Sequence, residues 1–331
     1  MVLTSWNFFN GGKNMLLFII LLMVGFVLLI KGADVFVDGA SNIALNLKIP
    51  KMIIALTIVA FGTSAPELAV SIKGVLSNAS DIVIGNVVGS NILNILLILG
   101  ISSLFSPMKV KDNTVKKEIP LTILFSTLLM VLCFDNMFEK NINMISRTDG
   151  MVIMLFFSIF IYYLFSVMKK GKKEEETAEM SMIKSIIFTI IGLAAIIFGS
   201  NLVVDNAVEI AKALSVSEKM ISLTIVALGT SLPELVTSVQ ASRKGENDIA
   251  IGNIIGSNIF NIGMVIGIPS TFIGKIIASG FNYIDMFVMV LASIMLFVLT
   301  FKERKLDKKQ GIIMLFIFVI YYAYVIIGGL K

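Results

Sequence analysis

Long apolar runs, separated by short polar segments, fill almost the whole chain of 331 residues. A helix needs about 20 apolar residues to cross a bilayer, and these runs are long enough. The runs and their polar ends predict ten helices, at residues 15–47, 51–76, 81–106, 117–135, 148–168, 183–213, 217–242, 248–272, 281–301 and 310–329. The first and the sixth exceed one perpendicular crossing of a hydrocarbon core of about 30 Å, so we expect them to be tilted or to extend beyond it.

The composition favours an all-α polytopic membrane protein. Hydrophobic residues make up 57% of the chain and charged residues 15%, with a mean hydropathy of +0.95. A soluble domain would carry about 25% charged residues. The first fourteen residues lack the basic region and small-residue cleavage site of a signal peptide, so we expect the apolar run from Leu16 to be a retained first span.

Basic residues gather on one side of the predicted helices. If the N-terminus lies outside, most lysines and arginines fall at the inner helix ends, with clusters at 169–173 and 302–309. The positive-inside rule then places both termini on the extracellular side of the cell (cytoplasmic) membrane. Residues 169–182 form a charged cytoplasmic linker. The net charge of +5 comes from loop lysines and indicates no nucleic-acid partner.

The chain contains an internal duplication. TIVAFGTSAPELAVS at 57–71 returns as TIVALGTSLPELVTS at 224–238, and DIVIGNVVGSNILNI at 81–95 returns as DIAIGNIIGSNIFNI at 248–262. Both pairs lie 167 residues apart, without insertions. The duplication predicts two repeats of five spans, at 1–168 and 183–331, joined by the linker at 169–182.

An odd number of spans turns the second repeat upside down in the membrane. Equivalent helices then cross in opposite directions, and the repeats are related by a pseudo-two-fold axis in the membrane plane. Inverted repeats with broken helices are typical of secondary transporters, whose substrate site lies near the midplane between the halves.

Each copy of the first motif combines a helix break with a carboxylate. Pro66 has no N–H group and should open the helix, which leaves carbonyl groups without intrahelical partners. Glu67 follows directly, and Pro233 and Glu234 repeat the arrangement. A carboxylate inside the membrane is costly and by default functional. A cation would neutralise it and would also satisfy the free carbonyls.

Further oxygen-bearing side chains are expected to line the same cavity, some on the helix face of each glutamate and others on the next helix. In the first motif these are hydroxyls, and in the second they recur every fourth residue: Thr63, Ser64, Thr230 and Ser231, then Asn86, Ser90 and Asn94 with Asn253, Ser257 and Asn261. Hard oxygen ligands suit Ca²⁺, Na⁺ or Mg²⁺, and the reluctance of Mg²⁺ to lose water favours the first two. The chain has no histidine and one cysteine, which excludes imidazole chemistry and a disulfide framework.

Other polar and small residues have structural interpretations. Gly85 and Gly89, like Gly252 and Gly256, have the spacing that permits close helix contact, so we assign them no ligand role. On the long first and sixth helices, we expect the acidic residues to be interfacial or paired. These residues are Asp34, Asp38 and Asp205.

At these motifs the sequence resembles the cation/calcium exchanger superfamily, and looks most like its prokaryotic sodium/calcium exchanger branch. The resemblance rests on GTSAPE (62–67) with GNVVGSN (85–91), and on GTSLPE (229–234) with GNIIGSN (252–258). It implies a five-plus-five bundle in which the second, third, seventh and eighth helices enclose a diamond of cation sites. It also implies that the first and sixth helices slide to alternate access.

The resemblance also implies a role for each matching residue. Glu67 and Glu234 would be central Ca²⁺ ligands shared with Na⁺, and Thr63 and Thr230 would offer backbone oxygens. Ser64, Ser231, Ser90 and Ser257 would form Na⁺ sites, and Ala60 and Ala227 would offer carbonyls. Asn94 would lie at the centre. Its partner Asn261 departs from relatives that carry an aspartate, so this site has two carboxylates where those have three.

The charge count predicts an antiporter that exchanges Na⁺ for Ca²⁺ by alternating access, without a cofactor. One Ca²⁺ or two Na⁺ neutralise two carboxylates, so the ions should compete, whereas three Na⁺ would leave excess positive charge in a low-dielectric site. A Ca²⁺/H⁺ antiporter and a K⁺-dependent exchanger on the same fold stay open as alternatives. A cation channel fits inverted halves less well. An enzyme is disfavoured because the chain has no nucleotide-binding loop and no histidine base.

Overall fold

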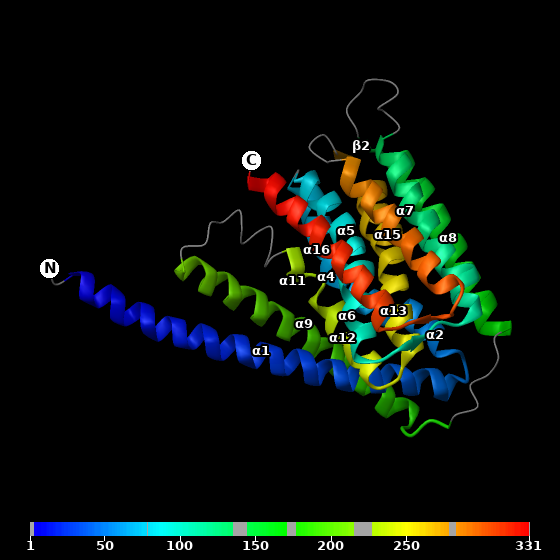
Figure 1. Cartoon of the computed structure of the whole chain (residues 1–331), viewed down its shortest axis with the longest axis horizontal. Coiled ribbons are helices and arrows are strands. Elements are labelled where there is room, and N and C mark those ends of the chain that lie inside the picture. The colour runs from blue at the N-terminus through cyan, green and yellow to red at the C-terminus, as the bar shows by residue number, and fades with distance from the viewer. Residues whose placement is uncertain are drawn as a thin grey trace.

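The structure, a computed structural model, describes residues 3–77, 79–134, 144–170, 177–214, 227–277 and 283–330. Within these ranges the chain is helical apart from loops and four two-residue strands (Figure 1). Eight described helices are long and apolar enough to cross a membrane, or nine if the bent pair Lys51–Thr63 and Ala65–Leu76 is one span. The prediction of an all-helical, multi-pass membrane protein is therefore confirmed.

The helices of the first half follow the predicted spans, several of them with π-helical segments (η). They are α1 (Leu3–Leu47), α2 (Lys51–Ile54), η1 (Ala55–Val59), α3 (Ala60–Thr63), α4 (Ala65–Leu76), α5 (Ser80–Leu93), η2 (Asn94–Leu99), α6 (Gly100–Phe105), η3 (Thr114–Glu118), α7 (Ile119–Phe134) and α8 (Arg147–Lys170). A π-helical turn carries one extra residue and often marks a functional site.

The second half is described from α9 onward. Its helices are α9 (Met182–Ala213), α11 (Ala227–Gly229), α12 (Leu232–Arg243), α13 (Asn247–Phe260), η6 (Asn261–Ile266), α14 (Gly267–Phe272), α15 (Tyr283–Phe301) and α16 (Lys308–Leu330). Of the predicted helix at 217–242, residues 217–226 lie outside the described residues.

The long helices α1 and α9 run side by side along the lower edge of the molecule (Figure 1). Helix α1 has 45 residues and α9 has 32, which correspond to about 68 and 48 Å at 1.5 Å per residue. Both exceed the hydrocarbon core, as predicted. Helix α1 begins at Leu3 instead of residue 15, because Gly11 and Gly12 weaken a helix without breaking it.

Glycines bring the backbones of α1 and α9 into direct contact. A Cβ atom on Gly32 would lie 3.0 Å from the carbonyl oxygen of Gly192, and one on Gly192 would lie 2.5 Å from the backbone nitrogen of Phe36. Such spacing leaves no room for a larger residue. The two helices therefore form one tightly packed pair.

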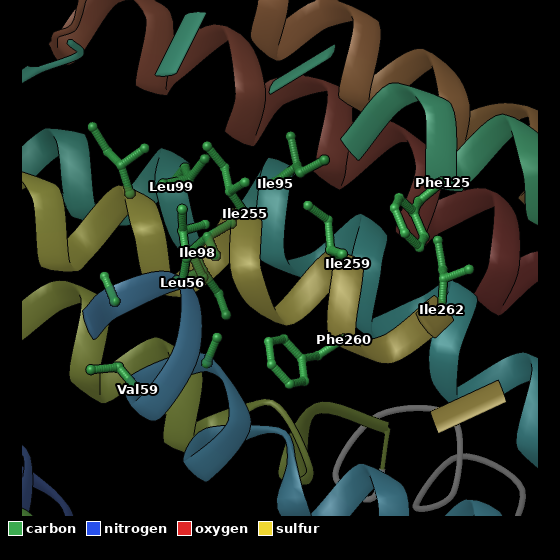
Figure 2. Packing of buried hydrophobic residues seen from close by; sticks show 14 of the residues in the cluster. Leu56, Val59, Ile95, Ile98, Leu99, Phe125, Ile255, Ile259, Phe260 and Ile262 are labelled. Carbon is green, nitrogen blue, oxygen red and sulfur yellow. The ribbon is translucent and has the colours of Figure 1, made fainter. Parts of the chain in front are cut away.

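The core of the bundle lies around the third helix of each half. In the most apolar 18-residue stretch of each span, 72% is buried in Ile82–Phe105 and 94% in Asn247–Phe272. Figure 2 shows Ile255 and Ile259 of α13 packed near Leu56 of η1 and Ile95 of η2. These central helices also carry the second duplicated motif, so the core holds it away from lipid.

The second-copy glycines pack as their spacing predicts. A Cβ atom on Gly252 would lie 2.5 Å from that of Ala55, and one on Gly256 would lie 2.6 Å from that of Ala60. No described residue lies within 4 Å of a Cβ placed on Gly89. Gly256 contacts Leu56 and Ala60, so by the 167-residue offset Gly89 would contact residues 223 and 227. Residue 223 lies outside the described residues, so close packing of Gly85 and Gly89 stays a prediction.

Two antiparallel ribbons connect the halves. Strand β1 (Met108–Lys109) pairs with β4 (Lys305–Leu306), and β2 (Met144–Ile145) pairs with β3 (Ile276–Ile277). Each ribbon joins a loop of the first half to a loop of the second. Backbone hydrogen bonds therefore hold the peripheral helices of the two halves together.

Candidate ion-binding site

The first motif breaks its helix at Ser64. Helix α3 ends at Thr63, α4 begins at Ala65, and the two parts are bent by 47°. Pro66 lies in the first turn of α4, where its missing N–H group leaves no bond unmade. Glu67 lies in the same turn, at the positive end of the helix dipole. The break predicted from the proline is thus present.

The second motif repeats this geometry. Helix α11 ends at Gly229 and α12 begins at Leu232, with Pro233 and Glu234 in its first turn. Ser231 at the break has φ −90° and ψ 4°, close to the values of −84° and 4° at Ser64. The duplicated sequences therefore adopt the same local fold.

The two glutamates are fully buried and lie near each other. Both have 0% exposure, and their carboxylates are close enough to interact electrostatically. The hydroxyl of Ser64 donates to Glu234 Oε1 at 3.2 Å, so the break of one half contacts the carboxylate of the other. Both oxygens of Glu67 and Oε2 of Glu234 are buried without a hydrogen-bond donor among the described residues.

Hydroxyl and amide groups from the two halves alternate around these carboxylates. Thr63 Oγ1 donates to Asn253 Oδ1 at 3.1 Å and lies 3.4 Å from Ser257 Oγ. On the equivalent side, Ser231 Oγ donates to Ser90 Oγ at 3.2 Å. A matching bond, of 3.2 Å, runs from Thr230 Oγ1 to Asn86 Oδ1. The first motif of each half thus contacts the second motif of the other half.

Four asparagines, two from each half, are hydrogen-bonded to one another. The side-chain amides of Asn91 and Asn258 each donate to the backbone carbonyl oxygen of the other residue, at 3.2 Å. Asn94 donates to Asn258 Oδ1 at 2.9 Å, and Asn261 donates to Asn91 Oδ1 at 3.0 Å. The acceptor oxygens of Asn94 and Asn261 have no donor among the described residues.

Local backbone geometry places Asn94 and Asn261. Each is the first residue of a π-helical segment, η2 or η6. The extra residue of a π turn re-aims side chains relative to a regular helix. Sequence reasoning assigned no role to Asn91 and Asn258, although the repeat of the final asparagine in GNVVGSN and GNIIGSN was a visible signal.

Most of the predicted site residues are buried within this network. Buried are Ala60, Thr63, Ser64, Glu67, Ser90, Asn94, Ser231, Glu234, Ser257 and Asn261, while Thr230 is half-buried. Ala227 is the first residue of α11. The Ala60 carbonyl accepts from the backbone N–H of Ser64 at 3.0 Å, so one of its lone pairs is already used within the helix. Of the two glutamates, Glu67 has both carboxylate oxygens without a donor among the described residues, whereas Glu234 has one.

The site presents hard oxygen acceptors that lack donors. Five such atoms come from Glu67, Glu234, Asn94 and Asn261. An ionised group in a low-dielectric interior costs several kcal/mol unless an opposite charge compensates it. Within the described ranges, no three acidic or sulfur side chains gather as metal ligands. The combination of two carboxylates with neutral oxygens has the chemistry that suits Na⁺ or Ca²⁺.

Comparison with known proteins places the chain in a family. A model of the sodium/calcium exchanger protein family matches residues 17–166 and 184–327. The chain belongs to this family. It is therefore a membrane transporter of the exchanger class and not an enzyme, and the resemblance seen in the two motifs is confirmed.

Relatives are similar over most of their length. The sodium/calcium exchanger MaX1 of Methanosarcina acetivorans is 34% identical over 91% of this chain and 96% of its own. The inner membrane protein YrbG of Escherichia coli is 38% identical over 77% and 80%. A solved structure of the sodium–calcium exchanger NCX_Mj, soaked with Na⁺ and Sr²⁺, matches with a TM-score of 0.81 and 36% identity, over 93% of this chain and 98% of that one.

Proposed function

We propose that this exchanger moves Na⁺ and Ca²⁺ in opposite directions through one shared site between its halves. The observation that supports the proposal is a set of five buried oxygen acceptors for which the described residues supply no donor, and which belong to Glu67, Glu234, Asn94 and Asn261. Backbone oxygens of Thr63 and Thr230 and the hydroxyls of the four motif serines complete the proposed ligand set. Relatives named as sodium/calcium exchangers support the choice of ions.

Charge makes the two ions exclude each other. One Ca²⁺ neutralises the pair Glu67 and Glu234, and two Na⁺ do the same. Both loads together would leave two uncompensated positive charges, and unit charges 4 Å apart repel by about 4 kcal/mol at an effective dielectric constant of about 20. Occupation by one ion therefore displaces the other, which is the condition for exchange instead of co-transport.

We also propose that the two halves, 1–168 and 183–331, are inverted five-span repeats joined by the linker at 169–182. Reciprocal bonds between residues 167 positions apart support this arrangement, since Asn91 pairs with Asn258 and Ser126 Oγ lies 3.2 Å from Ser293 Oγ. A pseudo-two-fold axis running between these pairs accounts for both. Ten spans in the cell membrane with both termini outside follow from this symmetry and from the lysine distribution.

The tightly packed pair α1 and α9 is suited to move as one body. Its backbones touch at Gly32 and Gly192, whereas the ribbons β1–β4 and β2–β3 tie the remaining helices together. Movement of the pair past the bundle would open the site to one side at a time. The length of both helices allows such a shift while apolar surface stays in lipid.

Flux in proteoliposomes tests the proposed exchange. With Na⁺, K⁺ and pH gradients imposed one at a time, an outward Na⁺ gradient should drive ⁴⁵Ca²⁺ uptake in the presence of a proton uncoupler. Uptake driven by a pH gradient alone would instead identify a Ca²⁺/H⁺ antiporter. A strict need for K⁺ would identify the K⁺-dependent variant, and current without any counter-ion would identify a channel.

Asn261 offers a test of the charge count. With two carboxylates, exchange of two Na⁺ for one Ca²⁺ should respond little to an imposed membrane potential. The variant Asn261→Asp adds a third carboxylate, so a third Na⁺ becomes favourable and the exchange should become potential-dependent. The same change at the remote Asn113, Asn113→Asp, serves as the control. Equal potential dependence in the parent, Asn261→Asp and Asn113→Asp would contradict the inference that the number of carboxylates sets the number of Na⁺ ions exchanged.

A further inference from the structure

An ion-pair cluster ties α12 to α1 on one side of the molecule. Lys244, which follows the last residue of α12, lies with its Nζ 2.6 Å from Asp34 Oδ1 and 2.6 Å from Asp38 Oδ1. One turn earlier, Gln240 Nε2 donates to Asp34 Oδ1 at 2.8 Å. Helix α12 begins at the ion site, and its far end lies beside α1 (Figure 1). The cluster therefore links the site helix directly to the long helix pair.

The loop after α12 adds two contacts to the same region. Ser41 Oγ donates to Glu246 Oε1 at 3.0 Å, and Lys51 Nζ lies 3.1 Å from Glu246 Oε2. On this side, α1 is thus held against α12 and against the start of α2. A cavity of about 500 Å³ borders Asp38 and Glu246 on this side, and none of its lining residues belongs to the ion site.

The equivalent positions of the other half are arranged differently. A displacement of 167 residues relates Lys244 to Ser77 and Asp34 to Asn201, neither of which is charged. The charged residues of this half are Lys73 on α4, which corresponds to Gln240, and Asp205 on α9, which corresponds to Asp38. No ion pair joins Lys73 to Asp205 among the described contacts. A cavity of about 140 Å³ lies between these helices, lined among others by Pro66 and Val70 of α4, by Asp205 of α9 and by Thr230. It reaches Thr230 of the ion site.

We propose that Lys244, Asp34 and Asp38 form a latch that keeps one entrance to the ion site closed, and that Lys73 and Asp205 form the matching latch in the alternate state. The proposal rests on the proposed function, because it requires a site that opens to one side at a time. In a carrier of two inverted repeats, the alternate state exchanges the arrangements of the halves. The closed side then opens, and the cavity between α4 and α9 closes.

The cluster is suited to open in every transport cycle. Lys244 is 24% exposed, and Asp34 and Asp38 are 37% and 45% exposed, so water screens the attraction. Such pairs contribute little to stability but shift an equilibrium between states of similar energy. Burial lowers the pKa of Lys244, yet the hydrogen bonds to Asp34 and Asp38 outweigh it and raise the pKa above its usual value. The lysine therefore stays charged near neutral pH.

Cross-linking that reports the alternate state tests the latch. In a Cys133→Ser background, which removes the only cysteine, Lys73→Cys and Asp205→Cys are combined and treated with a short bifunctional thiol reagent. We expect the cross-link to form when α4 and α9 approach each other, so its rate should follow the population of the state in which the cavity is closed. Adding Lys244→Met should raise the rate about fivefold, because one side then loses its closing contact.

Two matched variants separate the latch from a general effect of charge or folding. Lys244→Arg keeps both ion pairs and should leave the rate unchanged, as should Arg243→Met, which removes a charge from the neighbouring residue. Equal rates in Lys244→Met and Arg243→Met would overturn the proposal, and so would the absence of any cross-link in all backgrounds. Na⁺-driven ⁴⁵Ca²⁺ uptake by the parent protein is measured in parallel. Absence of this uptake would contradict the proposed function, whereas the comparison of cross-linking rates tests the latch alone.

Discussion

Replacing Glu67 or Glu234 by glutamine should reduce Na⁺-driven Ca²⁺ uptake by at least about 100-fold. Glutamine keeps the volume of the side chain but removes its charge. A divalent ion would then enter a buried site with a single carboxylate, which leaves one positive charge uncompensated in a low-dielectric interior. Loss of uptake in both variants is measured with ⁴⁵Ca²⁺ in proteoliposomes at equal protein content.

Folding and binding can be separated for these variants. Neither oxygen of Glu67 has a donor within the described part of the chain, so its neutralisation should leave the ion-free protein as stable as before or more stable. Ca²⁺ should raise the unfolding temperature of the parent and lose this effect in Glu67→Gln and Glu234→Gln. The control Glu209→Gln alters an exposed carboxylate paired with Lys212 and should behave as the parent. Normal transport by both site variants would refute the assignment.

The variant Gly192→Ala should destabilise the protein by about 1–3 kcal/mol, although alanine favours helices over glycine by about 1 kcal/mol. The added Cβ would lie 2.5 and 2.7 Å from the nitrogen and Cα of Phe36, and 2.8 Å from the carbonyl oxygen of Gly32. All three atoms belong to the backbone, so neither helix can yield by turning a side chain. Thermal unfolding in detergent measures the loss.

The same variant should also slow transport, because it separates the two helices proposed to move as one body. Gly274→Ala is the matched control, since the nearest atom to its Cβ would be Val75 Cγ1 at 3.8 Å. It should change neither unfolding nor flux. An unfolding temperature of Gly192→Ala equal to that of the control would mean that α1 and α9 do not pack as closely as the structure shows.

Much of the candidate site was predictable from the two copies of each motif. Pro66 and Pro233 indicated where the helices break, because proline lacks the N–H group that a helix interior needs. Glu67 and Glu234 stood out because an ionisable group within an apolar run is costly to bury. The duplication showed that both should be considered together. Their common environment could be expected from inverted repeats, but the sequence contains no distances.

Other features could not be predicted from a linear pattern. Nothing in the spacing of Asn91 and Asn258 indicated that each amide binds the other residue's carbonyl, because that contact depends on how α5 and α13 cross. The π-helical turns at Asn94 and Asn261 depend on packing in the core and leave no mark in the hydrophobic period. The start of α1 at Leu3 was likewise missed, since weak local preferences decide where a helix end frays.

The amino-acid sequence by itself determined the membrane class, the helix breaks and the chemical character of the site, because burial cost, proline geometry and ligand type are properties of individual residues in their local context. Only the tertiary structure decided which half supplies each contact, which carboxylate oxygens lack donors among the described residues, and that Lys244 reaches α1 while a cavity lies between α4 and α9. Those features depend on the relative placement of helices more than 100 residues apart in the chain. Such placement follows from the packing of the whole bundle and not from any one segment.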